Sequence, residues 1–200
     1  MAAGEKIKQF WKWLWHSDSI LSWLVALIFA FIIVKFIFFP IISFTFQTSL
    51  PLVVVESGSM HHPGTFLGNT FSTQGSFNLW WASSSRWYEN IGIYKEQSQE
   101  WPLRTGLEKG DIVLVQGWTK PKVGDIIIFS ADTVHPIIHR VVKIEVIDGK
   151  NVYSTKGDNN SDQLVSEKQI QENALIGKAV FRIPKLGWLK LFFVEIGKAL

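Results

Sequence analysis

The chain has 200 residues, enough for one domain and little more, and 47% of them are hydrophobic, including 10 Trp and 15 Phe, more aromatic side chains than a small soluble core needs. A net charge of only +3 leaves no dense stripe of Lys and Arg, which argues against nucleic acid as a partner. The absence of cysteine excludes disulfides, thiol catalysis and thiolate metal sites.

The first predicted element is a transmembrane helix. Residues 20–39 read "ILSWLVALIFAFIIVKFIFF" and are apolar apart from Ser22 and Lys35. A helix rises about 1.5 Å per residue, so this stretch spans the hydrocarbon layer of about 30 Å. A cleavable signal sequence has an apolar region of only about 7–15 residues and then a small-residue cleavage site, which this sequence lacks. We therefore predict an uncleaved anchor over residues 20–46.

The charges around this anchor predict its orientation. Lys6, Lys8 and Lys12 precede it, whereas residues 36–55 carry no charge of either sign. Positive charges are retained on the cytoplasmic side of a membrane. Residues 1–19 are therefore expected in the cytoplasm, and the chain beyond the anchor is expected on the opposite side.

Residues 47–183 have the pattern of a β-domain. Short runs rich in β-branched residues recur, and Asp148-Gly149 between two of them is a strong hairpin signal. Residues 165–175 are expected to form a short helix or an irregular connection before the last strand. The predicted strands lie in the segments "DIVLVQGW", "VGDIIIFSA", "PIIHRVVKIEVID", "NVYSTKG" and "IGKAVFRI".

Two further segments differ in amino-acid composition from the predicted strands. Residues 65–106 interleave aromatic residues with Gly, Ser, Asn and Gln, which predicts an insertion whose aromatic side chains pack on the β-domain or enter the lipid interface. Residues 184–200 are apolar with spaced lysines, and they are too short before Glu195 for a second span. We expect an amphipathic, membrane-associated segment there.

Without cysteine, a nucleophile has to be oxygen or nitrogen, and Ser59 in "ESGSM" is the first candidate. Gly58 beside it allows close backbone approach. A serine hydroxyl needs a base, and His139 lies in an apolar, β-branched strand where packing gives no reason to prefer imidazole over Val. A buried histidine satisfied by a backbone carbonyl is the alternative for His139.

A base works best when a third group holds its other ring nitrogen. The segment "TKGDNNSD" supplies Asp158 and Asp162 for this role, although Gly-Asp-Asn-Asn is also ideal for a plain turn.

A metal site was the other chemistry to consider. His61, His62, His135 and His139 are four of the five histidines, and the last two have the i, i+4 spacing that binds zinc on a helix. Pro136 interrupts that spacing and the neighbours are β-branched, so a helix is not expected there. The sequence therefore predicts neither a metal nor a cofactor.

The order of the short motifs is more specific than any one of them. "SGSM" is followed by "GDIVLV" and "GDIIIF", then by "IIHRV", then by "TKGDNN". This order resembles type I signal peptidases, in particular the branch found in archaea and in the endoplasmic reticulum. The resemblance covers the anchor and nearly all of residues 51–183 outside 65–106. It implies a mainly β fold, with a transmembrane helix followed by a signal-peptidase-like β-domain.

The resemblance also assigns roles to residues. It makes Ser59 the nucleophile and puts His139 where the bacterial branch has its lysine base. Ser57 and the backbone N–H of Ser59 would hold the oxyanion.

The chain departs from the family pattern at two points. The usual proline two positions after the methionine is displaced to Pro63 by two histidines, and the family's second acid falls on Leu164. Asp162, or Asp158 acting alone, is therefore expected to orient the imidazole.

The implied function is removal of signal peptides from secreted preproteins by a membrane-bound serine endopeptidase. The expected partners are preprotein signal peptides, the lipid bilayer and the protein translocation machinery. A compact single chain favours an archaeal plasma membrane over the endoplasmic reticulum. One alternative is a Ser-Lys dyad with Lys143, which is expected on the same strand face as His139 because positions i and i+4 of a strand point the same way. Another is a non-catalytic, membrane-anchored assembly or binding subunit with the same fold.

Overall fold

The structure, a computed structural model, describes residues 3–64 and 73–199, so residues 65–72 of the predicted insertion lie outside it. The chain divides into two compact units, Met1–Thr45 and Phe46–Leu200.

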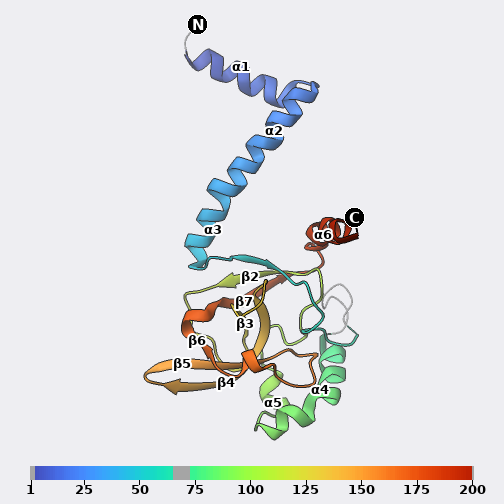
Figure 1. Cartoon of the computed structure of the whole chain (residues 1–200). Coiled ribbons are helices and arrows are strands. Elements are labelled where there is room, and N and C mark those ends of the chain that lie inside the picture. The colour runs from blue at the N-terminus through green and yellow to red at the C-terminus, as the bar shows by residue number, and fades with distance from the viewer. Residues whose placement is uncertain (1–2, 65–72, 200) are drawn as a thin grey trace. The chain divides into compact units, whose positions relative to one another are not determined.

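The first unit is helical. It contains α1 (Ala3–His16) and α2 (Ile20–Ile33), and α2 continues through a π-helical turn (Val34–Phe38) into α3 (Phe39–Phe46), whose last residue is the first of the second unit (Figure 1). Ser19 caps α2, because its Oγ accepts a hydrogen bond of 3.1 Å from the backbone N–H of Ser22. The helix Ile20–Phe46 has 27 residues and contains an 18-residue stretch with a mean hydropathy of 2.8, so it is long and apolar enough to cross a membrane. This is the segment for which the sequence predicts the anchor.

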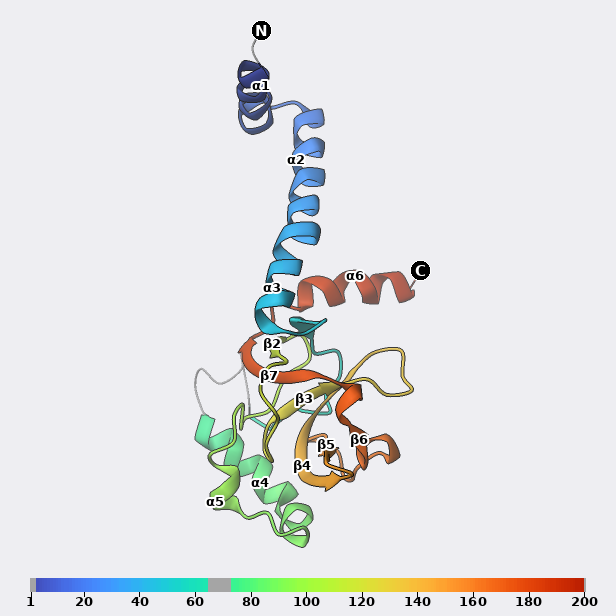
Figure 2. The ribbon, with the colours of Figure 1, turned by 90° about the vertical axis from the view of Figure 1, so that its left-hand side faces the viewer.

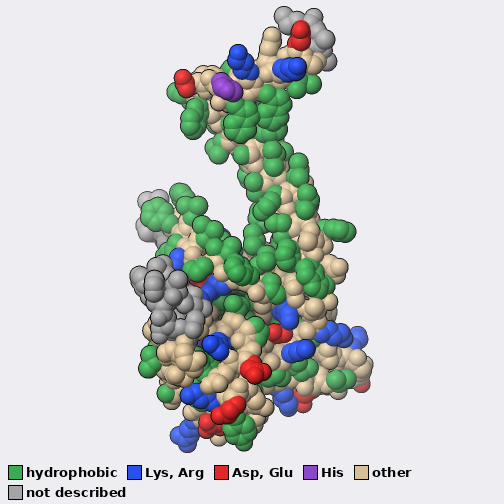
Figure 3. Space-filling view, turned by 180° about the vertical axis from the view of Figure 1, so that it is seen from behind, with side chains coloured by type: hydrophobic (Ala, Val, Ile, Leu, Met, Phe, Trp, Pro, Cys, Tyr) green, Lys and Arg blue, Asp and Glu red, His purple; other side chains and the backbone are tan. Residues whose placement is uncertain are grey.

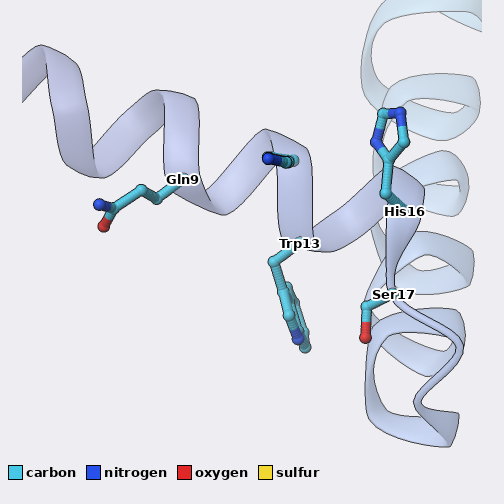
Figure 4. Close-up of a pocket in the computed structure, with 5 residues that line it drawn as sticks. Gln9, Trp13, His16 and Ser17 are labelled. Atoms are coloured by element: carbon cyan, nitrogen blue, oxygen red, sulfur yellow. The ribbon is translucent and has the colours of Figure 1, made fainter.

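Helix α1 was not predicted, although its residues alternate between apolar and polar in a helical period. Gln9, Lys12, Trp13, His16 and Ser17 line an open pocket on it (Figure 4). None of the candidate catalytic residues contributes to this pocket.

The second unit is built on a seven-stranded antiparallel sheet in the order β1-β2-β7-β3-β4-β5-β6, with the early strands at one edge (Figures 1 and 2). The mainly β fold predicted from the sequence is thereby confirmed. The strands are β1 (Leu52–Val54), β2 (Ile112–Gln116), β3 (Ile126–Phe129), β4 (Ile137–Ile147), β5 (Lys150–Lys156), β6 (Ile170–Gln171) and β7 (Leu175–Ile183).

The two short strands, β1 and β6, were not predicted, and the other five match the predicted segments, except that β5 and β7 each begin one residue earlier. Asp148 and Gly149 join β4 to β5 with φ values of 51° and 74°, as the hairpin signal predicts. Strand β3 is buried along its whole length, which explains its continuous apolar run. It is therefore a central strand, and β4, which carries His139, pairs directly with it.

The insertion contains helices where the sequence predicted only an aromatic-rich insertion. Helix α4 spans Thr73–Asn90 and α5 spans Lys95–Ser98. The aromatic residues of α4 include Phe77, Trp80 and Trp81, which have helical spacing. The many Gly, Ser and Asn residues of this segment obscured that period. A buried aromatic cluster forms around these side chains and includes Val142 of β4, so the described part of the insertion packs on the β-domain.

Residues 165–175 form two 3₁₀ turns, Val165–Glu167 and Glu172–Ala174, on either side of β6, which agrees with the predicted irregular connection.

Helix α6 (Trp188–Ala199) follows β7. The Nζ atom of Lys190 on α6 lies 3.1 Å from Oε1 of Glu56, next to the "SGSM" segment. On α6, Leu189, Phe192 and Phe193 are 60–70% exposed, and apolar side chains gather along this helix in Figure 3.

Candidate active site

Ser59 lies on a short loop that follows β1. Val55 and Met60 bury their side chains in the same core cluster, so both ends of the loop are fixed and the residues between them are pushed outward. The backbone confirms this anchoring, because Leu107 N–H donates to Met60 O at 2.8 Å and Gly110 N–H donates to Val55 O at 2.8 Å. Ser59 is half-buried at the top of this loop.

The structure brings Ser59 and His139 together from positions that are 80 residues apart. Ser59 Oγ lies 2.9 Å from Nε2 of His139, within hydrogen-bond distance. His139 comes from β4, where it pairs with Ile127 of the central strand β3, and it is only 4% exposed. A buried imidazole on a central strand has little freedom, so the ring holds its orientation toward the serine.

The other ring nitrogen of His139 contacts a carboxylate that sequence reasoning missed. Nδ1 of His139 donates to Oε1 of Glu167, which is fully buried at the end of the first 3₁₀ turn. Glu167 is held in turn by the hydroxyl of Thr155 at 3.1 Å and by the backbone N–H of Leu164 at 2.6 Å. With Nδ1 protonated, Nε2 is free to accept the proton of Ser59.

Glu167 was missed because the family spacing directs attention to residue 164. That position holds Leu164, which is 49% exposed. Glu167 is the first acidic residue after Asp162, and a search over the whole connection to β7 would have found it.

Asp158 does not contact His139. Its carboxylate binds the guanidinium of Arg140, with Oδ2 2.7 Å from Nη2, and it also lies 2.8 Å from Nε2 of His62. Successive side chains of a strand point to opposite faces, so a carboxylate bound to Arg140 is on the wrong side of β4 for His139. The structure therefore gives Asp158 a different partner from the one expected.

The electrostatics of this buried group are consistent with an ion pair. Burial alone would raise the pKa of the Asp158 carboxyl, but the Arg140 guanidinium and the His62 hydrogen bond hold that pKa well below its usual range. Burial lowers the pKa of His62 despite the neighbouring Asp158, which favours the neutral imidazole. Asp158 and Arg140 thus form a charged pair in the interior, with His62 as a neutral neighbour.

Asp162 does not contact His139 either. It lies at the surface, where its Oδ1 accepts hydrogen bonds from Trp87 Nε1 at 2.9 Å and from the backbone N–H of Gln163 at 2.7 Å. These two hydrogen bonds lower the pKa of the Asp162 carboxyl. Neither of the two predicted aspartates is thus brought to the imidazole, and Glu167 stands in that place.

Ser57 lies beside the candidate nucleophile, as the resemblance implies. The two hydroxyl oxygens of Ser57 and Ser59 are 3.1 Å apart, and Ser57 is exposed. A hydroxyl at this position is able to donate to an oxygen that develops negative charge next to Ser59.

The Ser-Lys alternative loses its geometric basis. A bulge between Val141 and Lys143 interrupts the pairing of β4 with β5, so the regular alternation from His139 to Lys143 is broken. The Lys143 side chain is 62% exposed and its Nζ lies 2.8 Å from Glu145. His135, the partner that a zinc site would need, lies outside any helix and is exposed.

Gly157 leaves room for the imidazole, and we predict that Gly157→Ala lowers catalytic activity. A Cβ at residue 157 would lie 2.8 Å from His139 Nε2 and 2.7 Å from Nδ2 of Asn160. A displacement of about 1 Å at reacting groups costs roughly 100-fold in rate, so we expect a loss of that order. The test is the turnover of a peptide or preprotein substrate, with Gly4→Ala as control, because a Cβ at residue 4 meets nothing within 4 Å. Unchanged turnover in Gly157→Ala would mean that the imidazole of His139 does not act as a base from the position it has in the structure.

The sequence of the chain is similar to those of signal peptidase complex catalytic subunits. No family model matches the chain. The chain is 28% identical to the signal peptidase complex catalytic subunit SEC11 of Lachancea thermotolerans over 65% of its own length and 82% of that protein. It is 29% and 31% identical to the proteins of the same name from Yarrowia lipolytica and Scheffersomyces stipitis, over 46% of this chain and 59% and 61% of theirs. The chain thus spans about three fifths of these last two relatives.

The second unit therefore is a mainly β domain in which a serine, a histidine and a carboxylate form a chain of contacts, and the same chain holds a candidate membrane span. Together with the SEC11 matches, this relates the protein to the type I signal peptidases of the endoplasmic-reticulum branch.

Proposed function

We propose that this protein is a membrane-bound serine endopeptidase that removes signal peptides from secreted preproteins. The observation that carries the proposal is the 2.9 Å contact between Ser59 Oγ and His139 Nε2, with Glu167 on the opposite nitrogen of the ring. The relatives are named catalytic subunits of a signal peptidase complex, which supports both a peptidase and this class of substrate.

The proposed reaction begins when Ser59 Oγ attacks the carbonyl carbon of the scissile peptide bond and His139 Nε2 takes the hydroxyl proton. Glu167 stabilises the imidazolium that forms. The resulting oxyanion would accept hydrogen bonds from the Ser57 hydroxyl and the Ser59 backbone N–H, each worth about 3 kcal/mol in comparable sites.

His139 then gives its proton to the leaving amine, the C–N bond breaks, and the signal peptide stays on Ser59 as an ester. A water molecule attacks this ester while His139 takes one of its protons. The carboxylic acid of the signal peptide is released and Ser59 regains its hydrogen. The cycle needs no group outside the chain and water.

The proposed topology puts residues 1–19 in the cytoplasm and the β-domain on the opposite side of the membrane, where a translocated signal peptide is presented. The candidate span and the preceding lysines support this orientation. An archaeal plasma membrane was expected from the compact chain, but the named relatives come from eukaryotes, which weighs against it. The relatives' name also suggests assembly into a membrane complex, with preproteins arriving from the translocation machinery.

The test is cleavage of a preprotein by the full-length protein reconstituted in lipid with any subunits that copurify. We expect the product to begin at the signal-peptide boundary, as read by mass spectrometry, with wild type and with Lys143→Ala. Ser59→Ala is expected to give no product. Equal cleavage by wild type and Ser59→Ala would refute the serine mechanism, whereas absence of cleavage by wild type in every lipid would favour a non-catalytic binding subunit.

We also propose that α6 lies in the membrane interface. Its exposed Leu189, Phe192 and Phe193 form an apolar face, and Lys190 on the same helix is positioned at the polar side by Glu56. The chain holds no cysteine, so Phe193→Cys provides a single site for an environment-sensitive dye. In liposomes we expect a blue-shifted emission from position 193 and a water-like emission from Val165→Cys, which is 90% exposed on a 3₁₀ turn. Water-like emission from both positions would contradict the interfacial placement.

A further inference from the structure

The proposed reaction does not use the aromatic insert, by which we mean the described residues 73–106. Its side chains are nevertheless among the most deeply buried of the chain, with Phe77 and Tyr88 at 0% exposure and Trp80 at 2%. A segment that only covered the sheet would need apolar contacts alone. The insert instead makes directed polar contacts with the turn at residues 157–160, which is next to the candidate active site.

Trp80 makes the most specific of these contacts. Its indole N–H donates to the backbone carbonyl of Asp158 at 2.9 Å. Its ring lies flat on the imidazole of His62, with centroids 4.4 Å apart and an angle of 8° between the planes. Both His62 and Asp158 are buried, so Trp80 contacts two groups in the interior and helps to hold them in place.

Other side chains of the insert hold the two ends of the same turn. Lys156, just before the turn, places its Nζ 5.2 Å from the ring centroid of Trp87 and 5.3 Å from that of Tyr88. After the turn, the N–H of Trp87 donates to Asp162. The hydroxyl of Tyr88 reaches Asp158 Oδ1 at 3.4 Å.

The turn in its own right holds the Ser59 loop. Asn159 N–H donates to Ser59 O at 2.7 Å, and the side-chain amide of Asn159 donates to Gly58 O at 3.1 Å. Asp158 N–H points at Met60 Sδ at 3.4 Å. The turn therefore holds the carbonyls of Gly58 and Ser59. Trp80 in its place holds the turn through the carbonyl of Asp158.

We propose that Trp80 is a positioning residue for catalysis: through the Asp158 carbonyl and His62, it sets the place of the turn, and thereby the approach of Ser59 to His139. This inference rests on the proposed serine mechanism but not on the identity of the substrate. It gives the aromatic insert a role in reactivity, beyond covering the sheet.

Trp81 offers a matched control. It lies in the same cluster, 6% exposed, and stacks on Tyr88 with centroids 5.8 Å apart. It is the neighbour of Trp80 on α4, but the indole that bonds the Asp158 carbonyl is that of Trp80. Trp→Phe at either position removes an indole N–H and a similar volume, so the packing costs are similar and the loss of the turn contact is particular to Trp80.

The experiment measures the rate at which a fluorophosphonate labels Ser59 in the full-length protein, since this reaction needs an activated serine but no preprotein. In it, Ser59 Oγ forms a bond to phosphorus, fluoride leaves, and His139 takes the proton. We expect Trp80→Phe to label about 10- to 100-fold more slowly than wild type, because small displacements of reacting groups have effects of this size. Trp81→Phe is expected to stay within about threefold, with thermal unfolding midpoints of the two variants within a few degrees.

A second readout separates positioning from general loosening. For preprotein cleavage, Trp80→Phe is expected to lower kcat with little change in KM, since Trp80 is buried and acts through the turn. Equal labelling by wild type and Trp80→Phe, or equal losses in Trp80→Phe and Trp81→Phe, would overturn the inference. Trp80-dependent labelling without preprotein cleavage would support the inference and reject the proposed substrate. Absence of labelling in wild type would reject both proposals.

Discussion

Replacing Glu167 by Gln is expected to lower kcat for preprotein cleavage by about 10³- to 10⁴-fold, the size of effect seen when the acid of a Ser-His-acid triad is replaced by its amide. The amide oxygen of the new side chain is able to take the place of Oε2 and keep the hydrogen bond from the Leu164 backbone. Its NH₂ group then faces Nδ1 of His139. The ring responds by carrying its proton on Nε2, where it can no longer accept the proton of Ser59.

Two companion variants make this result specific. Glu172→Gln changes a surface carboxylate that pairs with Lys120 at 3.3 Å, and it should leave kcat unchanged. Asp162→Asn, at the position expected from the sequence, should also keep most of the activity, because that carboxylate binds Trp87 at the surface. Full activity in Glu167→Gln together with a large loss in Asp162→Asn would mean that Asp162 moves to His139 in the working enzyme.

The second large effect is on stability, and we expect it from Arg140→Met. Arg140 is fully buried, and its guanidinium donates to the Asp158 carboxylate and to the backbone carbonyls of Pro102, Leu103 and Gly124. Loss of the guanidinium leaves a buried carboxylate without its counter-charge and removes a donor from three carbonyls, of which Leu103 O keeps the N–H of Gly106. Breaking a buried ion pair in this way costs about 3–5 kcal/mol, a large part of the free energy of unfolding of a small domain.

Urea unfolding of the full-length protein in detergent measures this cost, with the exposed Arg86→Met as control. The double variant Arg140→Met with Asp158→Asn should be less destabilised than the sum of the two single variants, because it removes the unpaired charge. A loss below about 1 kcal/mol in Arg140→Met would show that water or another group satisfies Asp158, and that the pair does not hold the turn.

The longer strands could be predicted because their residue types match the burial of each strand in the sheet. Runs rich in β-branched residues marked β2, β4, β5 and β7, and the continuous apolar run of β3 follows from its burial on both faces. Strand β1, with three residues, and β6, with two, are too short for a period to appear. They form because their neighbours supply the hydrogen bonds.

The site was predicted where local chemistry was unusual and missed where it depended on the path of the chain. Ser59 stood out because the chain has no cysteine and Gly58 precedes it, and His139 stood out because it does not fit its apolar strand. The acid was sought at the family spacing, whereas the 3₁₀ turn at Val165–Glu167 brings Glu167 under the ring from farther along the chain. We predicted a contact between Asp158 and His139 because both lie in recognisable motifs. In the structure the carboxylate of Asp158 binds Arg140, whose side chain points to the opposite face of the strand from His139.

The most direct test of the account is whether Ser59 and His139 act as one unit. Preprotein cleavage by the full-length protein should be measured for Ser59→Ala, His139→Ala and the double variant, against wild type. Groups that perform one step together give non-additive losses, so we predict that each single variant loses about 10⁴-fold or more and that the double variant is no worse than either. Substantial activity in either single variant, or losses that multiply in the double variant, would contradict the mechanism.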